Sequence, residues 1–208
     1  MLFPNIAIGG PMCSGKTATA DALVAGWGYT RISLATRLKE LASQVFVAGD
    51  PIDKVASYPI YPEGNDEGQI ISGRELLQRL GDAPKALEQD FWTLWLLHDI
   101  RNEVYGNGPF VVDDLRYVYE GELLRARGFS LVGLVANTPI RTQRFVARYG
   151  RYPSFAELGH HSETDWEFIT LDHMVPTDVF VATQVAERIA GLIGLPESPR
   201  SARGGTPH

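Results

Sequence analysis

Hydrophobic residues along the chain occur in short apolar runs, and these runs alternate with longer segments of helical spacing. Strands that alternate with helices in this way form a parallel sheet with crossover helices. The apolar runs predict strands at residues 2–8, 29–33, 110–113, 130–136 and 175–181. The helical spacing predicts helices at residues 16–25, 37–46, 74–80, 86–103, 119–127, 140–149 and 182–193. We therefore expect a three-layer α/β fold, with a parallel sheet of about five strands flanked by helices.

Some segments depart from this alternation or mark the ends of an element. Residues 49–73 contain three prolines and no hydrophobic period, which is typical of a long loop that covers or grips a substrate. Thr138 can cap a helix that starts at Pro139, and Gly150 can end this helix. Residues 196–208 contain no large apolar side chain, so we expect a disordered tail there.

The composition fits one globular domain in the cytoplasm. A chain of 208 residues, 44% of them hydrophobic, can bury one substantial core but is short for two, so residues 1–195 are assigned to a single domain. The formal net charge of −6 argues against nucleic acid as a partner, because binding its backbone requires a positive field. The single cysteine, Cys13, fits a reducing compartment. The sequence starts without a basic leader and has no run of roughly 20 apolar residues, so no membrane partner is expected.

The clearest chemical motif is Gly-Pro-Met-Cys-Ser-Gly-Lys-Thr at residues 10–17, which fits the pattern G-x-x-x-x-G-K-[ST]. In this pattern backbone amides surround a β-phosphate, the lysine reaches the β and γ oxygens, and the hydroxyl binds Mg²⁺. A predicted strand precedes the motif and a predicted helix follows it, which favours a phosphate-binding loop over a glycine turn with an incidental lysine. We expect ATP or GTP at this loop and assign ATP to Gly10, Cys13, Ser14, Gly15, Lys16, Thr17 and Ala18.

A kinase also requires a carboxylate that holds the magnesium ion on a neighbouring strand. The strand predicted at residues 110–113 leads into Asp113 and Asp114. Successive strand side chains point to opposite faces, so only one of the two is expected to face the phosphates, and the spacing does not choose between them. A capped strand end is the alternative interpretation. Residues 136–139 lack the N-K-x-D pattern with which a GTPase would read guanine.

Arginines without acidic neighbours characterise the stretch between residues 123 and 156. Arg141, Arg144 and Arg148 share one helical face, and guanidinium groups suit phosphate oxygens and a developing negative charge. We expect residues 138–160 to form a lid in which these three arginines act in catalysis and Arg141 also binds ATP. A solvated helix face is the alternative, although such faces usually mix charges of both signs.

The helix predicted at residues 74–80 carries the candidate acceptor site. Arg74 and Gln78 are four residues apart, so they can reach one ligand from the same face and bind a phosphate and a base edge. An exposed polar helix explains the pair equally well. Trp92 can stack on a base or belong to the core, and Lys39 can lie near the acceptor or on a solvated face.

Two adjacent histidines, His160 and His161, stand near Glu163 and suggest a metal site. Neighbouring side chains point apart, and no third ligand follows at helical spacing, so zinc is not expected. The segment 162–165 is more simply interpreted as a capping box that opens a helix at Trp166.

Several segments resemble, in order, motifs of the bacteriophage deoxynucleoside monophosphate kinases, a P-loop family. After the phosphate-binding loop come residues 33–39, which resemble F-A-x-x-L-K, and residues 73–81, which resemble R-E-L-L-Q-x-x-G. Residues 90–92 resemble D-x-W, residues 114–120 resemble D-V-R-F-x-x-E, and residues 161–163 resemble H-x-S-E or S-E. The order and spacing of the segments are more specific than any one of them, and they cover nearly the whole chain to about residue 180.

This resemblance implies the P-loop NTPase fold and Mg²⁺-dependent transfer of the ATP γ-phosphoryl group to a deoxynucleoside monophosphate. It implies that residues 49–85 grip this substrate, and that Asp114 is the matched acid although Asp113 can still hold the metal with Thr17. The substrate-binding residues are then Lys39, Arg74, Gln78, Trp92, Asp114 and Arg116. A homodimer is also implied, located in the host cytoplasm if a phage encodes the chain.

Other interpretations stay open from the sequence alone. The same motifs fit a P-loop kinase with another small acceptor, such as dephospho-coenzyme A, or an ATP-binding regulator without catalysis. Arg116 and Glu120 can form a simple ion pair four residues apart instead of binding a ligand. No motif aligns with residues 49–73, so the sequence does not say which bases are accepted, whether deoxyribose is required, or whether GTP can replace ATP.

Overall fold

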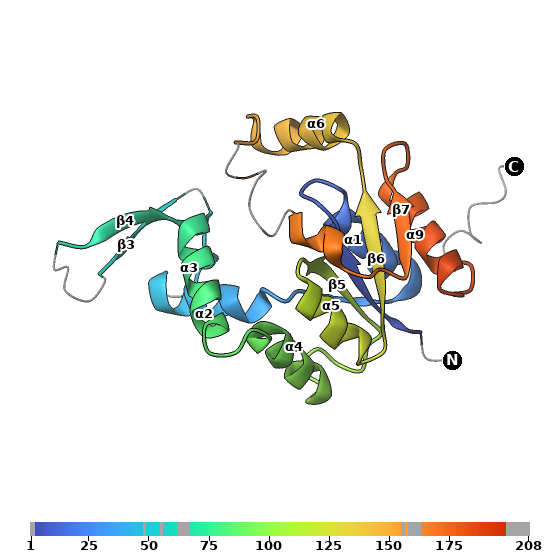
Figure 1. Cartoon of the computed structure of the whole chain (residues 1–208), viewed down its shortest axis with the longest axis horizontal. Coiled ribbons are helices and arrows are strands. Elements are labelled where there is room, and N and C mark those ends of the chain that lie inside the picture. Colours follow the sequence, from blue (N-terminus) through green and yellow to red (C-terminus); the bar gives the residue numbers. More distant parts are fainter. Residues whose placement is uncertain are drawn as a thin grey trace, which may run out of the picture. The chain divides into compact units, whose positions relative to one another are not determined.

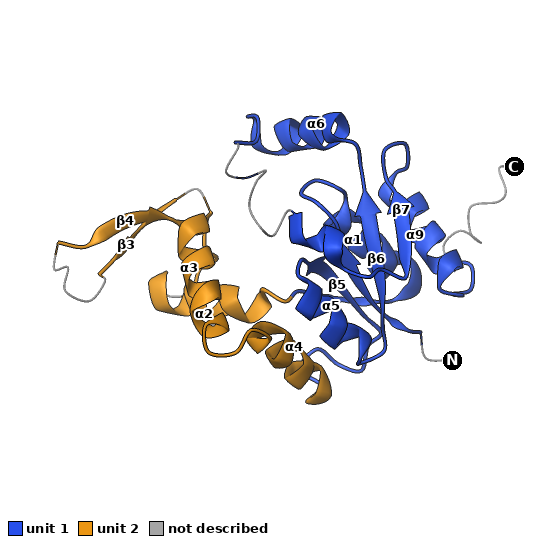
Figure 2. Cartoon of the chain, in the orientation of Figure 1, with its two compact units in different colours: residues 1–33, 103–208 blue, residues 34–102 orange. Residues whose placement is uncertain are grey.

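A computed structural model of the chain describes residues 3–47, 49–54, 56–61, 67–154, 157 and 164–198. They belong to two compact units, which Figure 2 colours separately. Unit 1 consists of residues 1–33 and 103–208, and unit 2 consists of residues 34–102. Each unit has its own helices and strands and its own apolar cluster.

Unit 1 is built on a five-stranded sheet (Figure 1). Its strands are β1 (Asn5–Gly9), β2 (Thr30–Ile32), β5 (Phe110–Leu115), β6 (Phe129–Val135) and β7 (His173–Pro176). The strands lie in the order β2-β5-β1-β6-β7, and every neighbouring pair is parallel. The predicted α/β class with a five-stranded parallel sheet is thereby confirmed.

Helices of unit 1 lie on both faces of this sheet. They are α1 (Lys16–Trp27), α5 (Val118–Arg125) and α9 (Ala182–Leu192), with a short 3-10 turn, η1 (Asp165–Phe168), whereas α6 (Thr138–Tyr149) lies beyond the carboxyl end of β6 (Figure 1). On one face, Ile6 and Ile8 of β1 pack with buried residues of α1 and α9. On the other face, a Cβ placed on Gly121 of α5 would lie 3.3 Å from the side chain of Leu131 in β6. Since side chains alternate along a strand, the sheet is the middle of three layers.

The last strand, predicted at residues 175–181, instead occupies His173–Pro176. Its early start follows from Asp172, whose Oδ2 accepts a hydrogen bond from the backbone N–H of Leu131 at 2.7 Å. The Oδ1 atom of Asp172 also lies 2.5 Å from Nη1 of Arg125. These contacts bind the beginning of β7 to β6, and the strand ends at a proline, which has no N–H to donate.

The ends of helix α6 follow the sequence prediction in part. Gly150 ends the helix in the left-handed conformation, with a φ of 68°, as predicted. Thr138 does not cap the helix, because it is already the first helical residue and Asn137 occupies the capping position. The predicted capping box at residues 162–165 lies partly outside the described residues, and Trp166 is buried in η1.

The predicted disordered tail begins with residues that are packed against α1. The indole Nε1 of Trp27 donates to the carbonyl of Pro196 at 2.8 Å, and the Ser198 hydroxyl donates to the carbonyl of Gly26 at 3.1 Å. The prediction of disorder from residue 196 is therefore wrong for these first residues, which bind backbone and indole groups without needing a large apolar side chain. Residues 199–208 lie outside the described part of the chain.

The described residues of unit 2 form helices and a β-hairpin, and the hairpin lies where the sequence predicted a long loop. The elements are α2 (Thr36–Phe46), β3 (Ser57–Ile60), β4 (Gln69–Ser72), α3 (Gly73–Lys85) and α4 (Phe91–Arg101). Tyr58 of β3 pairs with Ile71 of β4, and both pack on Leu76 of α3. Each strand has only four residues and β3 contains Pro59, so neither shows a clear period in the sequence.

The lengths of α3 and α4 also differ from prediction. Helix α3 continues past residue 80 to Lys85 and includes Pro84 in its last turn. Residues 86–90, predicted as the start of the next helix, are turns and irregular structure, and α4 begins after Asp90 at its capping position.

Two polar contacts join the helices of unit 2. The indole Nε1 of Trp92 in α4 donates to the carbonyl of Gly81 in α3 at 2.8 Å. In the other contact, Nε of Arg37 in α2 donates to Oδ2 of Asp99 in α4 at 2.7 Å, and the Asp99 side chain is 3% exposed. This hydrogen bond raises the pKa of Arg37 above its ordinary value.

The chain that precedes the hairpin passes so close to the start of α3 that only glycine fits there. The N–H of Gly73 donates to the carbonyl of Ala56 at 2.9 Å, and the N–H of Arg74 donates to the carbonyl of Lys54 at 3.1 Å. A Cβ on Gly73 would lie 2.1 Å from the carbonyl oxygen of Asp53. These carbonyls take up the first N–H groups of α3.

The Gly73→Ala variant is expected to lose about 1–3 kcal/mol of unfolding free energy, because the added methyl group collides with backbone that cannot move alone. Urea denaturation followed by circular dichroism measures the loss. Gly191→Ala in α9 is the matched control, since nothing lies within 4 Å of the added carbon, and it should stabilise by about 1 kcal/mol or less. Equal stability of Gly73→Ala and wild type would contradict the described close approach.

The Asp172→Asn variant tests the ion pair that starts β7. Partial burial alone raises the pKa of Asp172, but the hydrogen bonds from Leu131 N–H and Arg125 hold the pKa below its ordinary value. The carboxylate therefore stabilises the fold above about pH 4, its unfolded pKa, and this stabilisation is lost as the pH falls through the folded pKa. Denaturant melts should show a deficit of about 1–2 kcal/mol at pH 7 that narrows below pH 4. A stability deficit that is independent of pH would contradict a contribution from the negative charge of Asp172.

Candidate phosphate-binding site

The motif at residues 10–17 forms a loop between the end of β1 and the start of α1, as the sequence predicts. Gly10 has a φ of 134° and Gly15 has a φ of 101°, and residues other than glycine rarely adopt these backbone conformations. A Cβ on Gly10 would also lie 2.2 Å from the carbonyl oxygen of Leu134 in β6. Cys13 adopts a positive φ of 62°. The two motif glycines are therefore required by backbone geometry, whatever the loop binds.

The side chain of Lys16 binds two backbone carbonyls of this loop. Its Nζ donates to the carbonyls of Gly10 at 2.6 Å and Pro11 at 2.8 Å. Thr17 and Ala18 are exposed in the first turn of α1, and α1 brings the partial positive charge of its N-terminus to the loop. Anionic groups are favoured at such a position.

Asp113 and Asp114 lie at the end of β5, the neighbour of β1, and both are half-buried. The pairing of the two strands shifts here: Ala7 pairs with Val112, but Gly9 pairs with Leu115. The extra residue in β5 interrupts the side-chain alternation, so alternation alone does not decide how many of the two aspartates face the phosphates. The Ser33 hydroxyl donates to Oδ2 of Asp114 at 2.5 Å, so a side chain that follows β2 binds this carboxylate.

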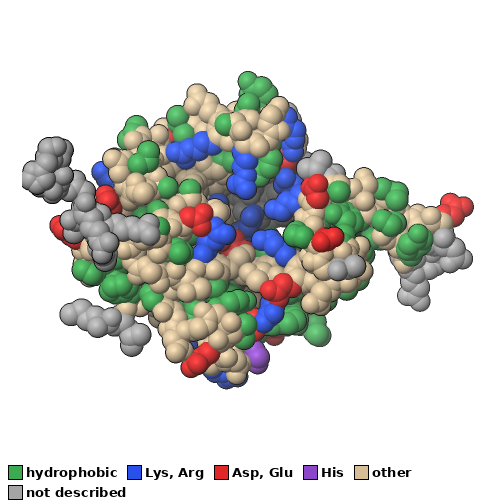
Figure 3. Space-filling view, turned by 180° about the vertical axis from the view of Figure 1, so that it is seen from behind, with side chains coloured by type: hydrophobic (Ala, Val, Ile, Leu, Met, Phe, Trp, Pro, Cys, Tyr) green, Lys and Arg blue, Asp and Glu red, His purple; other side chains and the backbone are tan. Residues whose placement is uncertain are grey.

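The predicted lid arginines differ in what they contact. Arg144 donates through Nη1 to the carbonyl of Cys13 at 3.3 Å, so it contacts the phosphate loop directly. Arg141 donates to the carbonyl of Ala136 at 3.1 Å and to the Thr138 hydroxyl at 3.2 Å, near the start of its own helix. Arg148 is exposed. Figure 3 shows several Lys and Arg side chains below α6, which lies at the top of the view.

The acid-free stretch ends at an ion pair. Arg151 donates through Nη1 and Nη2 to the two carboxylate oxygens of Glu157, at 2.7 and 2.8 Å. The guanidinium of Arg151 also lies 5.2 Å from the ring centre of Phe145. Arg151 is therefore paired with an acid that follows the acid-free stretch.

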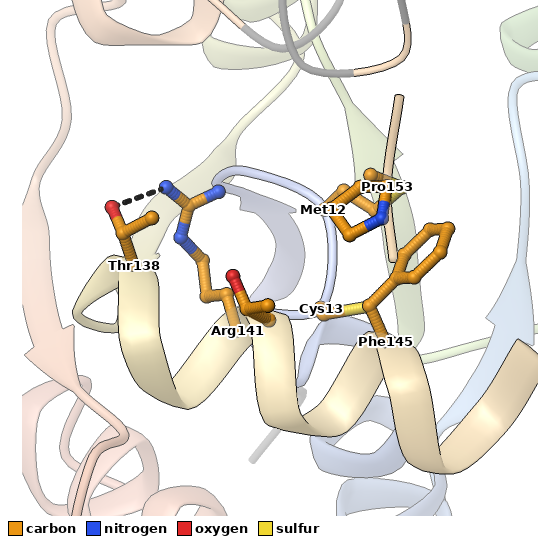
Figure 4. Close-up of a pocket in the computed structure, with 7 residues that line it drawn as sticks. Met12, Cys13, Thr138, Arg141, Phe145 and Pro153 are labelled. Atoms are coloured by element: carbon orange, nitrogen blue, oxygen red, sulfur yellow. Dashed lines mark hydrogen bonds between the residues drawn. The ribbon is translucent and has the colours of Figure 1, made fainter. Parts of the chain in front are cut away.

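A small pocket lies between the phosphate loop and α6 (Figure 4). It is lined by Met12, Cys13, Thr138, Arg141, Thr142, Phe145 and Pro153. Figure 4 shows Met12, Phe145 and Pro153 together on one side and the guanidinium of Arg141 on the other. The pocket places an apolar wall and one cation beside the phosphate loop.

The sequence did not single out Thr177, which is bound to the phosphate loop. Its hydroxyl donates to the carbonyl of Ser14 at 2.8 Å, and the side chain is buried directly after β7. The sequence offers only a weak signal for this contact, a threonine that follows an apolar strand. Ser33, which binds Asp114, ends a predicted strand and begins the segment that resembles F-A-x-x-L-K, but neither feature indicates this contact.

The residues predicted to bind the acceptor lie mostly in unit 2. Arg74 is half-buried in the first turn of α3, and Gln78 and Lys39 are exposed. Trp92 is 6% exposed and its N–H is bound to Gly81, so it serves the core of unit 2 and cannot offer its face to a base in this conformation.

Arg116 belongs to unit 1 and follows β5. Glu120 accepts hydrogen bonds from the backbone N–H groups of Arg116 at 2.9 Å and Tyr117 at 3.1 Å. Its carboxylate thus caps the start of α5.

The donor set near the loop suits a magnesium ion better than zinc. Asp113, Asp114 and the Thr17 hydroxyl offer hard oxygen ligands, which Mg²⁺ prefers together with phosphate oxygens and water. Within the described ranges, no group of three or more His, Cys, Asp or Glu residues could hold a metal ion. His160, His161 and Glu163 lie outside these ranges. No helix in the described part of the chain is long and apolar enough to span a membrane.

No protein-family model and no curated protein matches this sequence. Solved structures do match. A sugar kinase from a Janibacter species is 14% identical with a TM-score of 0.56, and the match covers 93% of this chain and 95% of that chain. Shikimate kinase from Acinetobacter baumannii, in complex with shikimate, is 18% identical with a TM-score of 0.50 over 98% and 96% of the two chains. A gluconokinase from Sinorhizobium meliloti is 15% identical with a TM-score of 0.50, over 93% and 94%.

At these identities the likeness concerns the fold. The five-stranded parallel sheet, with a phosphate loop between its first strand and first helix, is the P-loop fold that the chain shares with these kinases.

Proposed function

We propose that the protein is a Mg²⁺-dependent kinase that transfers the γ-phosphoryl group of ATP to a deoxynucleoside monophosphate and produces the diphosphate. The observation that carries the proposal is the phosphate loop of unit 1, with Lys16 inside it and the guanidinium of Arg144 on its Cys13 carbonyl. Asp113 and Asp114 on the neighbouring strand add the carboxylates that a phosphoryl-transfer site requires.

Unit 1 would bind the donor. Loop amides and Lys16 hold the ATP phosphates, and Thr17 holds the magnesium ion with Asp113 or Asp114. A magnesium ion held by these residues would supply positive charge that neutralises part of the phosphate charge. Arg141, Arg144 and Arg148 of α6 supply further positive charge. An oxygen of the acceptor phosphate attacks the γ-phosphorus, the bond from this phosphorus to the β,γ-bridging oxygen breaks, and ADP leaves. Catalysis then consists of positioning and charge neutralisation without a covalent enzyme intermediate.

Unit 2 would bind the acceptor. Carbonyls of Ala56 and Lys54 occupy the first N–H groups of α3, so an acceptor phosphate at this helix must be bound by side chains. The Arg74 guanidinium suits that task because its fork matches two phosphate oxygens. Gln78, one helical turn later, offers both a donor and an acceptor to a base edge. The likeness of residues 73–81 and 114–120 to the phage kinase motifs supports a nucleotide, with Arg116 near it. The same likeness supports a cytoplasmic homodimer.

A kinase with a different small acceptor is the second candidate. The similar structures are described as kinases of sugars, shikimate and gluconate, so one fold accommodates acceptors of different chemistry. Dephospho-coenzyme A is a further acceptor of this kind. A regulator that binds ATP without transfer is less well supported, because it has no need for arginines beside the phosphate loop.

An assay that couples ADP release to NADH oxidation distinguishes these candidates. With ATP and Mg²⁺, we expect turnover with at least one of the four deoxynucleoside monophosphates and little with gluconate, shikimate or dephospho-coenzyme A. Lys16→Met should reduce kcat by about 100-fold or more, because a charge next to the transferred group is lost, while the melting temperature changes little. Turnover with a sugar and with none of the deoxynucleoside monophosphates would favour the second candidate. Binding of ATP without turnover on any acceptor would favour the regulator.

The Arg74→Ala variant tests the acceptor site. The KM for the acceptor should rise about 10- to 100-fold, because charge-assisted hydrogen bonds to phosphate are lost, while the KM for ATP stays within about twofold. Arg79→Ala is the matched control, since Arg79 is on the same helix but is exposed and paired with Glu75 at 2.6 Å. If the two variants have a similar KM for the acceptor, Arg74 does not bind the acceptor phosphate.

A further inference from the structure

Two carbonyl groups of the phosphate loop accept hydrogen bonds from distant parts of unit 1. The Thr177 hydroxyl donates to the Ser14 carbonyl at 2.8 Å, and Arg144 donates to the Cys13 carbonyl at 3.3 Å. Thr177 follows β7, and Arg144 belongs to α6. The conformation of the loop is thus held by side chains that lie outside the loop motif.

Thr177 is fixed through each of its polar groups and is 2% exposed. Its N–H donates to the carbonyl of Val135 in β6 at 2.8 Å. Its carbonyl accepts from Nη2 of Arg144 at 2.6 Å, and its hydroxyl accepts from Nη1 at 3.1 Å. The hydroxyl has one hydrogen to donate, and the Ser14 carbonyl at 2.8 Å is a nearer acceptor than that of Val135 at 3.3 Å. The side chain is therefore held by the sheet and by α6 while it binds the loop.

The bond to the Ser14 carbonyl also sets the direction of an N–H group. Carbonyl and N–H of one planar trans peptide point in opposite directions, and the Ser14 carbonyl shares its peptide with the N–H of Gly15. With the carbonyl turned towards Thr177, this N–H points the other way. Gly15 has a φ of 101° and stands directly before α1. Loops of this type bind phosphate through such backbone N–H groups.

We infer that Thr177 is a positioning residue for nucleotide binding: its hydroxyl holds the Ser14–Gly15 peptide so that the Gly15 N–H is directed at a nucleotide phosphate before the nucleotide arrives. The inference rests on the proposed function to the extent that a nucleoside triphosphate must bind at the loop. Arg144 then has a structural task beside its charge, because its guanidinium holds Thr177 and the Cys13 carbonyl together.

The test compares the affinity of full-length variants for ATP and ADP by isothermal titration calorimetry, at a temperature at which each variant is folded. Thr177→Val keeps the branched shape but removes the hydroxyl, so the Kd for both nucleotides should rise about 5- to 20-fold. Thr177→Ser restores the hydroxyl and should bind within about twofold of wild type. If Thr177→Val does not fold, Thr177→Cys takes its place, since a thiol is a weak donor and should weaken binding in the same direction.

Thr93→Val is the matched control for loss of a buried hydroxyl. Thr93 is 1% exposed and lies in α4 of unit 2, so its variant can lose stability but should keep the wild-type affinity for ATP. Wild-type affinity in Thr177→Val, or an equal loss in Thr177→Val and Thr93→Val, would overturn the inference. A loss in Thr177→Val that Thr177→Ser does not restore would overturn it as well.

Failure of this inference and failure of the proposed function give different results. Unchanged ATP binding in Thr177→Val refutes the positioning role and leaves the kinase proposal intact. If no acceptor is phosphorylated, the kinase proposal is refuted, but the nucleotide affinities of the Thr177 variants still test the positioning role. If wild-type protein does not bind ATP or ADP at all, both are wrong.

Discussion

The carbonyl groups of the phosphate loop are bound by side chains, and the proposed chemistry of unit 1 depends on this. Lys16 binds the carbonyls of Gly10 and Pro11, Arg144 binds that of Cys13, and Thr177 binds that of Ser14. A loop whose acceptors are occupied in this way can offer N–H groups to an anion without leaving polar carbonyls unpaired. The positive charges of Lys16 and Arg144 favour the same ligand.

The parallel sheet is what brings these side chains to the loop. All neighbouring strands of unit 1 are parallel, so their carboxyl ends lie at one edge, where open α/β sheets bind ligands. At this edge β1 leads into the loop, β5 ends with its two aspartates, and β7 is followed by Thr177. Helix α6 follows β6 and brings Arg144 to the same place. An antiparallel strand in any of these positions would send its last residues to the opposite edge.

The parts of this arrangement that could be predicted are those that local sequence determines. An apolar run followed by a glycine-rich motif is enough to place β1, the loop and α1. The role of Thr177 could not be read in this way, because Thr177 is 163 residues from Ser14 along the chain. Likewise, the shift at Asp113 and Asp114 depends on the pairing of β5 with β1, which the sequence of β5 does not contain. The hairpin of unit 2 was missed because its stability comes from packing on Leu76 and not from a long alternating pattern.

The tryptophans offer a way to follow the two units separately. The chain has four; Trp27 and Trp166 belong to unit 1, and Trp92 and Trp95 belong to unit 2. The two indoles of unit 2 are stacked, with centroids 5.9 Å apart and planes 6° from parallel, whereas Trp27 donates its N–H to the carbonyl of Pro196. Two stacked chromophores couple, so unit 2 should contribute a near-ultraviolet circular dichroism signal of its own. Intrinsic fluorescence of the intact protein is therefore a sum of two environments and not the signal of a single reporter.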